Sequence, residues 1–193
     1  MKGKNLLMAA ILTATLTNID CAKAQHDTLI IQTNLGKIEA ELYNDIAPKT
    51  VAHMEKLAKE GFFDSLLFHR VIPGFVIQGG DPNSRHGDPD TWGIGQPGQE
   101  TVPAEFSKES HKRGILSMAR KGNDINSATS QFFICVADVP SLDNQYTVWG
   151  KVKKGMDVVD KIVNLPRDRR DRPQQKVILT KVIVITAAKP QAK

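Results

Sequence analysis

A β-hairpin predicted between Phe68 and Asp81 restricts the folds open to this chain. Two short apolar runs flank Pro73-Gly74, a dipeptide typical of a turn. Because successive side chains of a strand point to opposite faces, Phe68 and Arg70 are expected to share one face of the first run. Burying an unpartnered charge is costly, so Arg70 must either reach solvent or serve a site.

The second run of the hairpin alternates in the same way and ends in a pair of glycines. Phe75 and Ile77 are expected on one face. Val76 and Gln78 are expected on the other face, unless a bulge changes the alternation. Glycine in a strand lets another group approach the backbone closely, so the sequence around Gly79 is compatible with a binding site.

The rest of the chain predicts further strands and two helices. Helical spacing of apolar residues begins at Pro48 and ends at Gly61, and it returns between Gly155 and Val163. Strand-like runs occupy residues 28–33, 37–42, 114–118, 131–136, 146–152 and 176–185. The absence of β-α-β alternation favours a mainly β fold, and closure of a sheet removes its exposed edges. We therefore expect a closed eight-stranded antiparallel β-barrel capped by two α-helices.

Two loops and one helix position have their own sequence signals. Residues 82–98 are rich in Gly, Pro and Asp and lack periodicity, which predicts a long loop. Trp92 in this loop is interpreted as a packing anchor, with an exposed ligand contact as the alternative. Arginines and aspartates mix at residues 167–172, which indicates a solvated, ion-paired loop rather than a phosphate site. His53 lies among apolar helix positions and is expected to face solvent.

The first 24 residues have the pattern of a secretory signal peptide. A basic start precedes an apolar run that is too short to span a bilayer, and Ala22-Lys23-Ala24 is a small-x-small cleavage site. Cleavage there removes three basic residues and one acidic residue and lowers the formal net charge from +5 to +3, too little to indicate nucleic-acid binding. The mature domain is then residues 25–193, exported to the periplasm. The alternative is a lipoprotein anchored to the outer membrane through Cys21.

The side chains available for chemistry exclude several classes of enzyme. The five histidines are not spaced as metal ligands, and no cysteine pair supports zinc, so we expect no metal and no cofactor. The chain has no nucleophile elbow and no phosphate loop, and nothing favours pairing of His69 with a serine as a nucleophile. Cys135 lies in an apolar strand and is expected to be a buried, inert thiol. The remaining Arg, Gln, Phe and Leu residues can bind and polarise an amide without attacking it.

Four segments together resemble one family. They are FHRVIPGFVIQGGD at residues 68–81, GILSMA at 114–119, SQFFIC at 130–135, and Leu142-Asp143 leading to VWGKV at 148–152. These segments are similar to the cyclophilins, the cyclosporin-binding class of peptidyl-prolyl cis–trans isomerases. The resemblance covers residues 29–185 and implies the family's eight-stranded antiparallel barrel with two helices, in agreement with the pattern of predicted strands.

The resemblance also implies a site. Arg70 matches the catalytic arginine, and Gln78 matches a polar residue that holds this arginine and the substrate backbone. The walls and floor of the proline pocket correspond to Phe75, Val76, Phe133 and Leu142, of which Phe75 and Phe133 are grouped with Arg70 and Gln78 as catalytic. The remaining substrate-binding positions implied in this way are His69, Ala119, Arg120, Gln131 and Tyr146.

Two departures from the family pattern refine these expectations. Ser141 stands where members that bind cyclosporin tightly carry tryptophan, so only weak cyclosporin binding is expected. Arg120 stands where eukaryotic members usually have asparagine, which resembles a bacterial, exported subgroup. The partners implied are Pro-containing unfolded or exported polypeptides bound by a monomer. The alternative function is a periplasmic chaperone that binds Pro-containing segments with little turnover.

Overall fold

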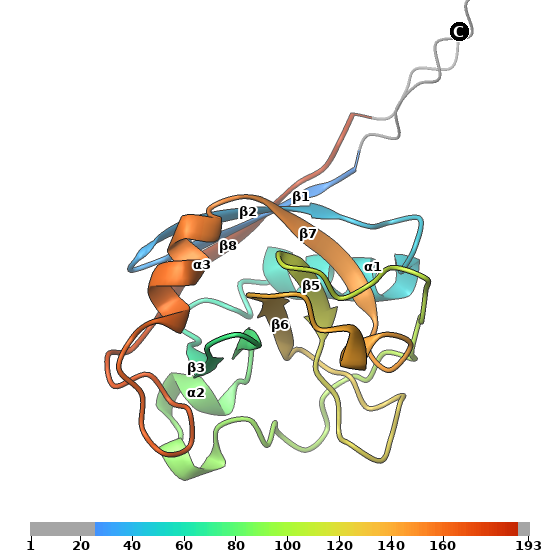
Figure 1. Ribbon diagram of the computed structural model, residues 1–193. Helices are drawn as coiled ribbons and strands as arrows, with labels where there is room; N and C mark the ends of the chain where they lie inside the picture. Colours follow the sequence, from blue (N-terminus) through green and yellow to red (C-terminus); the bar gives the residue numbers. More distant parts are fainter. Residues whose placement is uncertain (1–25, 189–193) are drawn as a thin grey trace, which may run out of the picture.

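The computed structural model describes residues 26–188 as one curled β-sheet with helices packed on it (Figure 1). The strands are β1 (Thr28–Thr33), β2 (Gly36–Leu42), β3 (Phe68–Ile72), β4 (Val76–Gly79), β5 (Ile115–Met118), β6 (Phe132–Cys135), β7 (Val148–Lys154) and β8 (Leu179–Ile185). The α-helices are α1 (Pro48–Lys59), α2 (Asn83–His86) and α3 (Met156–Val163), and 3₁₀ turns lie at η1 (Pro89–Thr91) and η2 (Pro140–Leu142). The proposed signal peptide lies outside the described residues.

All neighbouring strands pair antiparallel, in the order β3-β4-β6-β5-β7-β2-β1-β8. The two edges of this sheet meet just before β3 and β8. Leu67 forms a bridge with Ile178, and the Phe68 N–H donates to the Val177 carbonyl at 3.0 Å. The prediction of an eight-stranded antiparallel barrel is confirmed, with the seam joined by this short contact instead of a full strand pair.

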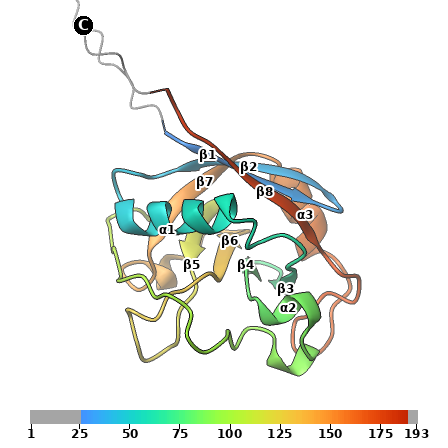
Figure 2. The same cartoon turned by 180° about the vertical axis from the view of Figure 1, so that it is seen from behind.

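The two longer helices pack on different parts of the sheet. Figure 2 shows α1 lying across the barrel beside β8, and Figure 1 shows α3 on the opposite flank beside β2. The sheet interior and these helices enclose the main core, whose largest buried side chains include Trp149, Phe63, Phe68, Phe132 and Leu116. Within residues 26–188 no helix combines the length and apolarity needed to cross a bilayer.

Helix α1 begins without a capping side chain of its own, because Ala47 stands at its N-cap. A carboxylate from far along the chain takes that role. Glu105 accepts the Lys49 N–H at 3.0 Å and the Thr50 N–H at 2.8 Å, two of the donors that a helix leaves unsatisfied at its start. The long-range contact fixes the segment after residue 100 against α1.

His53 on α1 is buried, and the prediction that it faces solvent is wrong. Its Nε2 lies 2.9 Å from the carbonyl oxygen of Thr129, and its side chain is only 7% exposed. The segment that covers it comes from the β5–β6 connection, which the helical periodicity of residues 48–61 does not reveal. A polar side chain on an apolar face is stable there because a backbone carbonyl satisfies it.

The predicted loop at 82–98 contains α2 and η1, which are too short to produce periodicity in the sequence. The fully buried carboxylate of Asp81 holds the segment, accepting the N–H groups of Asn83 and Gly93. The indole N–H of Trp92 donates to the Gly87 carbonyl at 3.2 Å, and the side chain is half-buried, as expected of a packing anchor.

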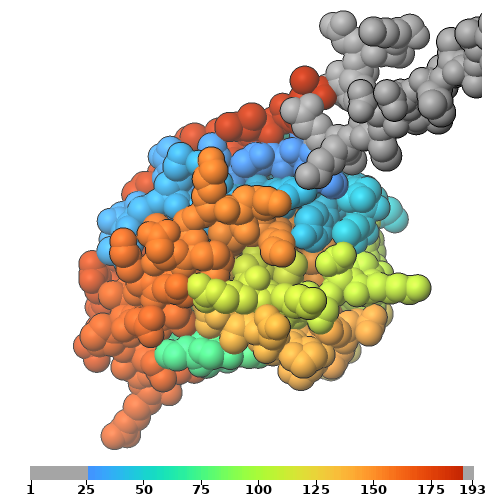
Figure 3. Space-filling model, turned by 45° about the horizontal axis from the view of Figure 1, so that its top comes forward, coloured from blue at the N-terminus to red at the C-terminus, as the bar shows by residue number. Residues whose placement is uncertain are grey.

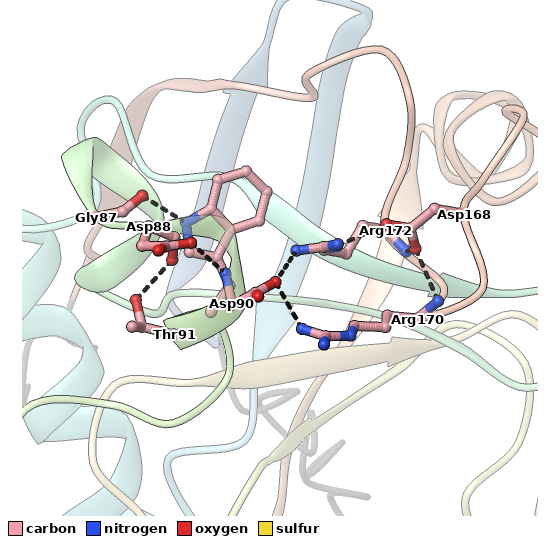
Figure 4. A network of polar contacts seen from close by, with 8 residues as sticks. Gly87, Asp88, Asp90, Thr91, Asp168, Arg170 and Arg172 are labelled. Atoms are coloured by element: carbon pink, nitrogen blue, oxygen red, sulfur yellow. Dashed lines mark hydrogen bonds and ion pairs between the residues drawn. The ribbon is translucent and has the colours of Figure 1, made fainter.

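Ion pairs join this segment to the loop between α3 and β8 (Figure 4). Asp90 Oδ1 lies 2.6 Å from Arg170 Nη1 and 3.1 Å from Arg172 Nη1. Arg172 also donates through Nε to Asp168 at 2.7 Å. The prediction of a solvated, ion-paired loop at 167–172 is therefore confirmed, and its partners include an aspartate about 80 residues away along the chain.

Candidate active site

A β-bulge in the opening hairpin decides where Arg70 points. Phe68 is opposite Gly79 and Arg70 is opposite Gln78, so His69 is the extra residue on β3. The inserted residue reverses the alternation. Phe68 is buried in the main core at 1% exposure, whereas Arg70 is half-buried on the other side. The prediction that Phe68 and Arg70 share a face is wrong for this reason.

Phe75 also departs from simple alternation, because it belongs to the turn and precedes the first residue of β4. Its N–H donates to the Ile72 carbonyl at 3.0 Å. Its ring packs with the same apolar cluster as Val76, while Ile77 lies in the main core. The expectation that Phe75 and Ile77 share a face is wrong, and the turn places Phe75 and Val76 side by side instead.

A second apolar cluster lies apart from the main core. Its buried members are Val76, Ile115, Phe133, Cys135 and Val148. Its half-buried members, which carry the cluster toward solvent, are Tyr43, Phe75, Ala119, Leu142 and Tyr146. The cluster unites the residues expected to form a proline pocket, although they come from positions 75–146 of the chain. Figure 3 shows green residues of the β3–β4 turn beside the gold residues that follow β6.

Phe133 and its neighbour Phe132 illustrate how β6 serves both clusters. Phe133 belongs to the second apolar cluster and Phe132 to the main core, as the predicted strand alternation requires. The Phe133 ring lies 5.7 Å from the Tyr146 ring at an interplanar angle of 81°, an edge-to-face contact. Phe133 is therefore held from one side by Tyr146 and is 5% exposed.

A row of amide and guanidinium groups borders this cluster. Arg70 Nη1 donates to Gln78 Oε1 at 3.2 Å, and Gln78 Nε2 donates to Gln131 Oε1 at 3.1 Å. Gln131 Nε2 in turn donates to the Gly93 carbonyl at 3.1 Å. Each amide both accepts and donates, so the row fixes the direction of every group in it. A guanidinium carries five N–H donors, and the bond to Gln78 uses one of them.

A polar cavity of about 550 Å³ continues from this row. It is lined by Gln78, Gly93, Ala119, Arg120, Thr129 and Gln131, among others. Arg120 is held at its side, with its guanidinium carbon 4.7 Å from the Tyr146 ring centroid and its Nε donating to the Gln145 carbonyl at 2.9 Å. Gln78 and Ala119 both line the polar cavity. Ala119 also belongs to the second apolar cluster, and Gln78 belongs to the polar row at its border, so the cavity and the cluster adjoin.

His69 is placed differently from the other expected site residues. It is 3% exposed and lines neither the second apolar cluster nor the polar cavity. Burial lowers the pKa of its imidazole to about 4, so the ring is neutral at physiological pH. The bulge carries its side chain inward beneath Gly93.

A buried hydrogen-bonded network behind Phe133 was missed at the level of sequence. His111 Nδ1 lies 2.9 Å from Asp143 Oδ1, and His111 Nε2 lies 3.0 Å from Ser117 Oγ. The hydroxyl of Ser110 and the backbone N–H of His111 donate to Asp143 and lower the pKa of that carboxyl to about 2. These residues lie up to 33 positions apart, and no local motif joins them.

Cys135 closes the base of the second apolar cluster and is fully buried. Burial raises the pKa of its thiol to about 12, so the group is an apolar packing element and not a nucleophile. Within residues 26–188 no three His, Cys, Asp or Glu side chains are grouped as metal ligands. The chemistry available at the site is therefore that of half-buried apolar side chains beside a positioned guanidinium.

The described part of the chain thus combines an eight-stranded barrel, an apolar cluster that reaches the surface, a positioned guanidinium and an adjoining cavity. The family described as cyclophilin type peptidyl-prolyl cis-trans isomerase/CLD matches residues 28–184. The chain belongs to this family of enzymes, the peptidyl-prolyl cis–trans isomerases, and the resemblance noted in the sequence is confirmed.

Relatives and solved structures agree with this assignment. The Schizosaccharomyces pombe peptidyl-prolyl cis-trans isomerase ppi1 is 42% identical over 161 residues, covering 80% of this chain and 97% of that protein. A probable peptidyl-prolyl cis-trans isomerase of Brucella suis is 45% identical over 163 residues, covering 81% and 83%. The crystal structure of a Cryptosporidium parvum cyclophilin type isomerase in the presence of the dipeptide Ala-Pro has a TM-score of 0.75 at 30% identity, covering 83% of this chain and 99% of that one.

Proposed function

We propose that this isomerase acts on X-Pro bonds of exported polypeptides during folding, as a monomer, with Arg70 stabilising the twisted amide. The observation that carries the proposal is the row from Arg70 through Gln78 to Gln131, which points a fixed guanidinium along the border of the second apolar cluster. A guanidinium is always protonated and presents rigid donors, so it suits this role.

The reaction needs no covalent bond to the enzyme. Resonance gives the amide C–N bond partial double-bond character, with a rotation barrier of about 18–20 kcal/mol. Twisting breaks the conjugation, and the proline nitrogen becomes pyramidal and more basic. A donor that binds the twisted amide more strongly than either planar isomer lowers the barrier. Arg70 supplies such a donor, and its bond to Gln78 orients it.

The second apolar cluster supplies the seat for the proline ring. Phe75, Val76, Phe133 and Leu142 surround the ring, and Tyr146 packs on the outer side of Phe133. Exclusion of water from this recess strengthens the hydrogen bonds that Arg70 makes. The polar cavity beside Ala119, Arg120 and Gln131 then receives the residues that precede the proline.

Export is the part of the proposal that concerns cellular location. We expect the protein, recovered from the organism that produces it, to begin at Gln25, because the small-x-small site ends at Ala24. Mass spectrometry of the mature N-terminus measures this directly. A diacylglyceryl group on Cys21 would instead assign the protein to the outer membrane, and a chain that retains Met1 and its first residues would contradict export.

Cyclosporin binding tests the departure at Ser141. This residue is exposed on η2 beside Leu142 of the second apolar cluster. We expect weak inhibition of the wild-type protein, and about tenfold tighter inhibition of Ser141→Trp, because an indole adds apolar area and an N–H donor at the rim. The inhibition constant in an isomerase assay measures the effect.

The exposed residue Thr180 on β8, at the end of the sheet order, offers a control for this experiment. A tryptophan there adds the same apolar area away from η2 and is expected to leave inhibition unchanged. Tight binding by the wild-type protein would show that Ser141 does not limit the affinity.

A further inference from the structure

His111 lies behind the pocket and is buried against aromatic side chains, which is unusual for a histidine. The residue is 1% exposed, and its ring is stacked on Phe133 with centroids 6.0 Å apart and planes 24° apart. The edge of its ring also faces Tyr146 at 6.5 Å. A single imidazole therefore supports the two aromatic side chains that we assign to the proline seat and its outer wall.

Hydrogen bonds at both ring nitrogens hold this imidazole in place. Asp143 Oδ1 is 2.9 Å from Nδ1, and Ser117 Oγ, on β5, is 3.0 Å from Nε2. Asp143 directly follows Leu142, so the same contact anchors the loop that contributes Leu142 and Tyr146 to the second apolar cluster. The ring thus connects β5, the β6 aromatic Phe133 and this loop.

A count of protons shows that the network changes with the charge of His111. Ser117 Oγ lies 2.8 Å from the Thr147 carbonyl as well as 3.0 Å from His111 Nε2, yet a hydroxyl has one proton. When the imidazole is protonated, Nε2–H donates to Ser117 and Ser117 donates to Thr147, so every contact is a hydrogen bond. When the imidazole is neutral with its proton on Nδ1, the hydroxyl can serve Nε2 or Thr147 but not both.

We propose that His111 is a positioning residue for prolyl isomerisation, which holds Phe133 and the 142–146 loop more firmly in its protonated form than in its neutral form. The inference rests on the proposed role of Phe133 in the proline seat. It extends that function by assigning a buried histidine, outside the groove itself, to the control of pocket geometry.

Two neighbouring titratable groups keep their charge state near neutrality. Asp143, from the loop after η2, stays ionised because its pKa is about 2. Cys135, on β6 in the same cluster, stays neutral because burial raises its pKa to about 12. Histidine ordinarily titrates between about pH 5 and 8.

The experiment measures kcat/KM of the wild-type protein between about pH 5 and 8, the range in which histidine titrates, on a blocked X-Pro peptide without ionisable side chains, by protease-free NMR exchange. We expect kcat/KM to fall about threefold as pH rises, which corresponds to part of one net hydrogen bond. The midpoint should coincide with the titration of the His111 ring, followed by its ¹⁵N signals. A flat profile, or a step whose midpoint differs from that of His111, would overturn the proposal.

Variants separate positioning from mere packing. His111→Gln keeps a polar donor and acceptor but cannot titrate, so its profile should be flat, and Asp143→Asn should move the step to lower pH by removing the anion that favours the imidazolium. His86→Gln, at an exposed histidine on α2, should keep the wild-type step. A step that persists in folded His111→Gln would overturn the proposal.

The wild-type measurements decide the question even if a variant does not fold. The proposed function fails separately, if folded Phe133→Ala isomerises the peptide as fast as the wild type. In that case the pocket assignment is wrong. A flat wild-type profile together with an inactive Phe133→Ala would instead support the pocket assignment and contradict only the role of His111.

Discussion

Replacing Arg70 with alanine is expected to lower kcat/KM on an X-Pro peptide by about 10- to 100-fold, because one charge-assisted hydrogen bond made in the twisted state is lost. The half-buried guanidinium is bonded to Gln78 and not to a core carbonyl, so its removal leaves the fold intact. Isomerase assays on the purified protein, with circular dichroism as a check on folding, measure the loss.

Two further arginine variants sharpen this test. Arg70→Lys keeps the charge but loses the planar fork, so it should recover only part of the activity. Arg85 on α2 is also half-buried and donates to the backbone carbonyls of Phe62 and Asp64, and Arg85→Ala should lower stability while retaining turnover per folded molecule. Near wild-type kcat/KM in folded Arg70→Ala would contradict the proposed mechanism.

Alanine in place of one of the two neighbouring phenylalanines on β6 should lower mainly stability, and in place of the other it should lower mainly turnover. Phe132 makes edge-to-face contacts with Phe63, Phe68 and Trp149 at centroid distances of 6.0, 5.9 and 6.0 Å. Phe132→Ala should therefore lower the free energy of unfolding by about 3–5 kcal/mol, a large part of the about 5–15 kcal/mol typical of a domain. Urea denaturation followed by fluorescence measures this change.

Phe133→Ala removes a ring from the second apolar cluster and should abolish most turnover per folded molecule. Stability also falls, because Phe133 is 5% exposed, so activity must be compared at equal concentrations of folded protein. The assignment of the two faces predicts that folded Phe132→Ala retains most of its kcat/KM. Equal loss of turnover in both variants would contradict it.

Local patterns in the sequence were enough to predict most of the barrel. The strand-like runs at 28–33, 37–42 and 131–136 and the helical spacing after Pro48 all correspond to observed elements. These features depend on side-chain periods within one element, which neighbouring residues determine by themselves. The same period of two accounts for Phe132 and Phe133 on opposite faces, and the four family segments led to the correct family.

The detailed geometry of the site depends on contacts between distant residues. The bulge at His69 inserts one residue into the ladder with β4. A prediction based on strict alternation of side chains does not include such an extra residue. Glu105 at the start of α1, Thr129 over His53, and Asp143 against His111 are likewise partners that only the folded chain brings together. None of these pairs has a local signal, because each lies more than 30 residues apart in sequence.

The sequence by itself thus determined the strands, the two longer helices, the buried thiol and the family. The tertiary structure alone decided that Arg70 leaves the face of Phe68, that Phe75 turns toward Val76, and that His69 points inward. The physical reason is that backbone periodicity is a local property, whereas a bulge, a turn and a buried hydrogen bond are selected by the packing of strands that meet only when the barrel closes.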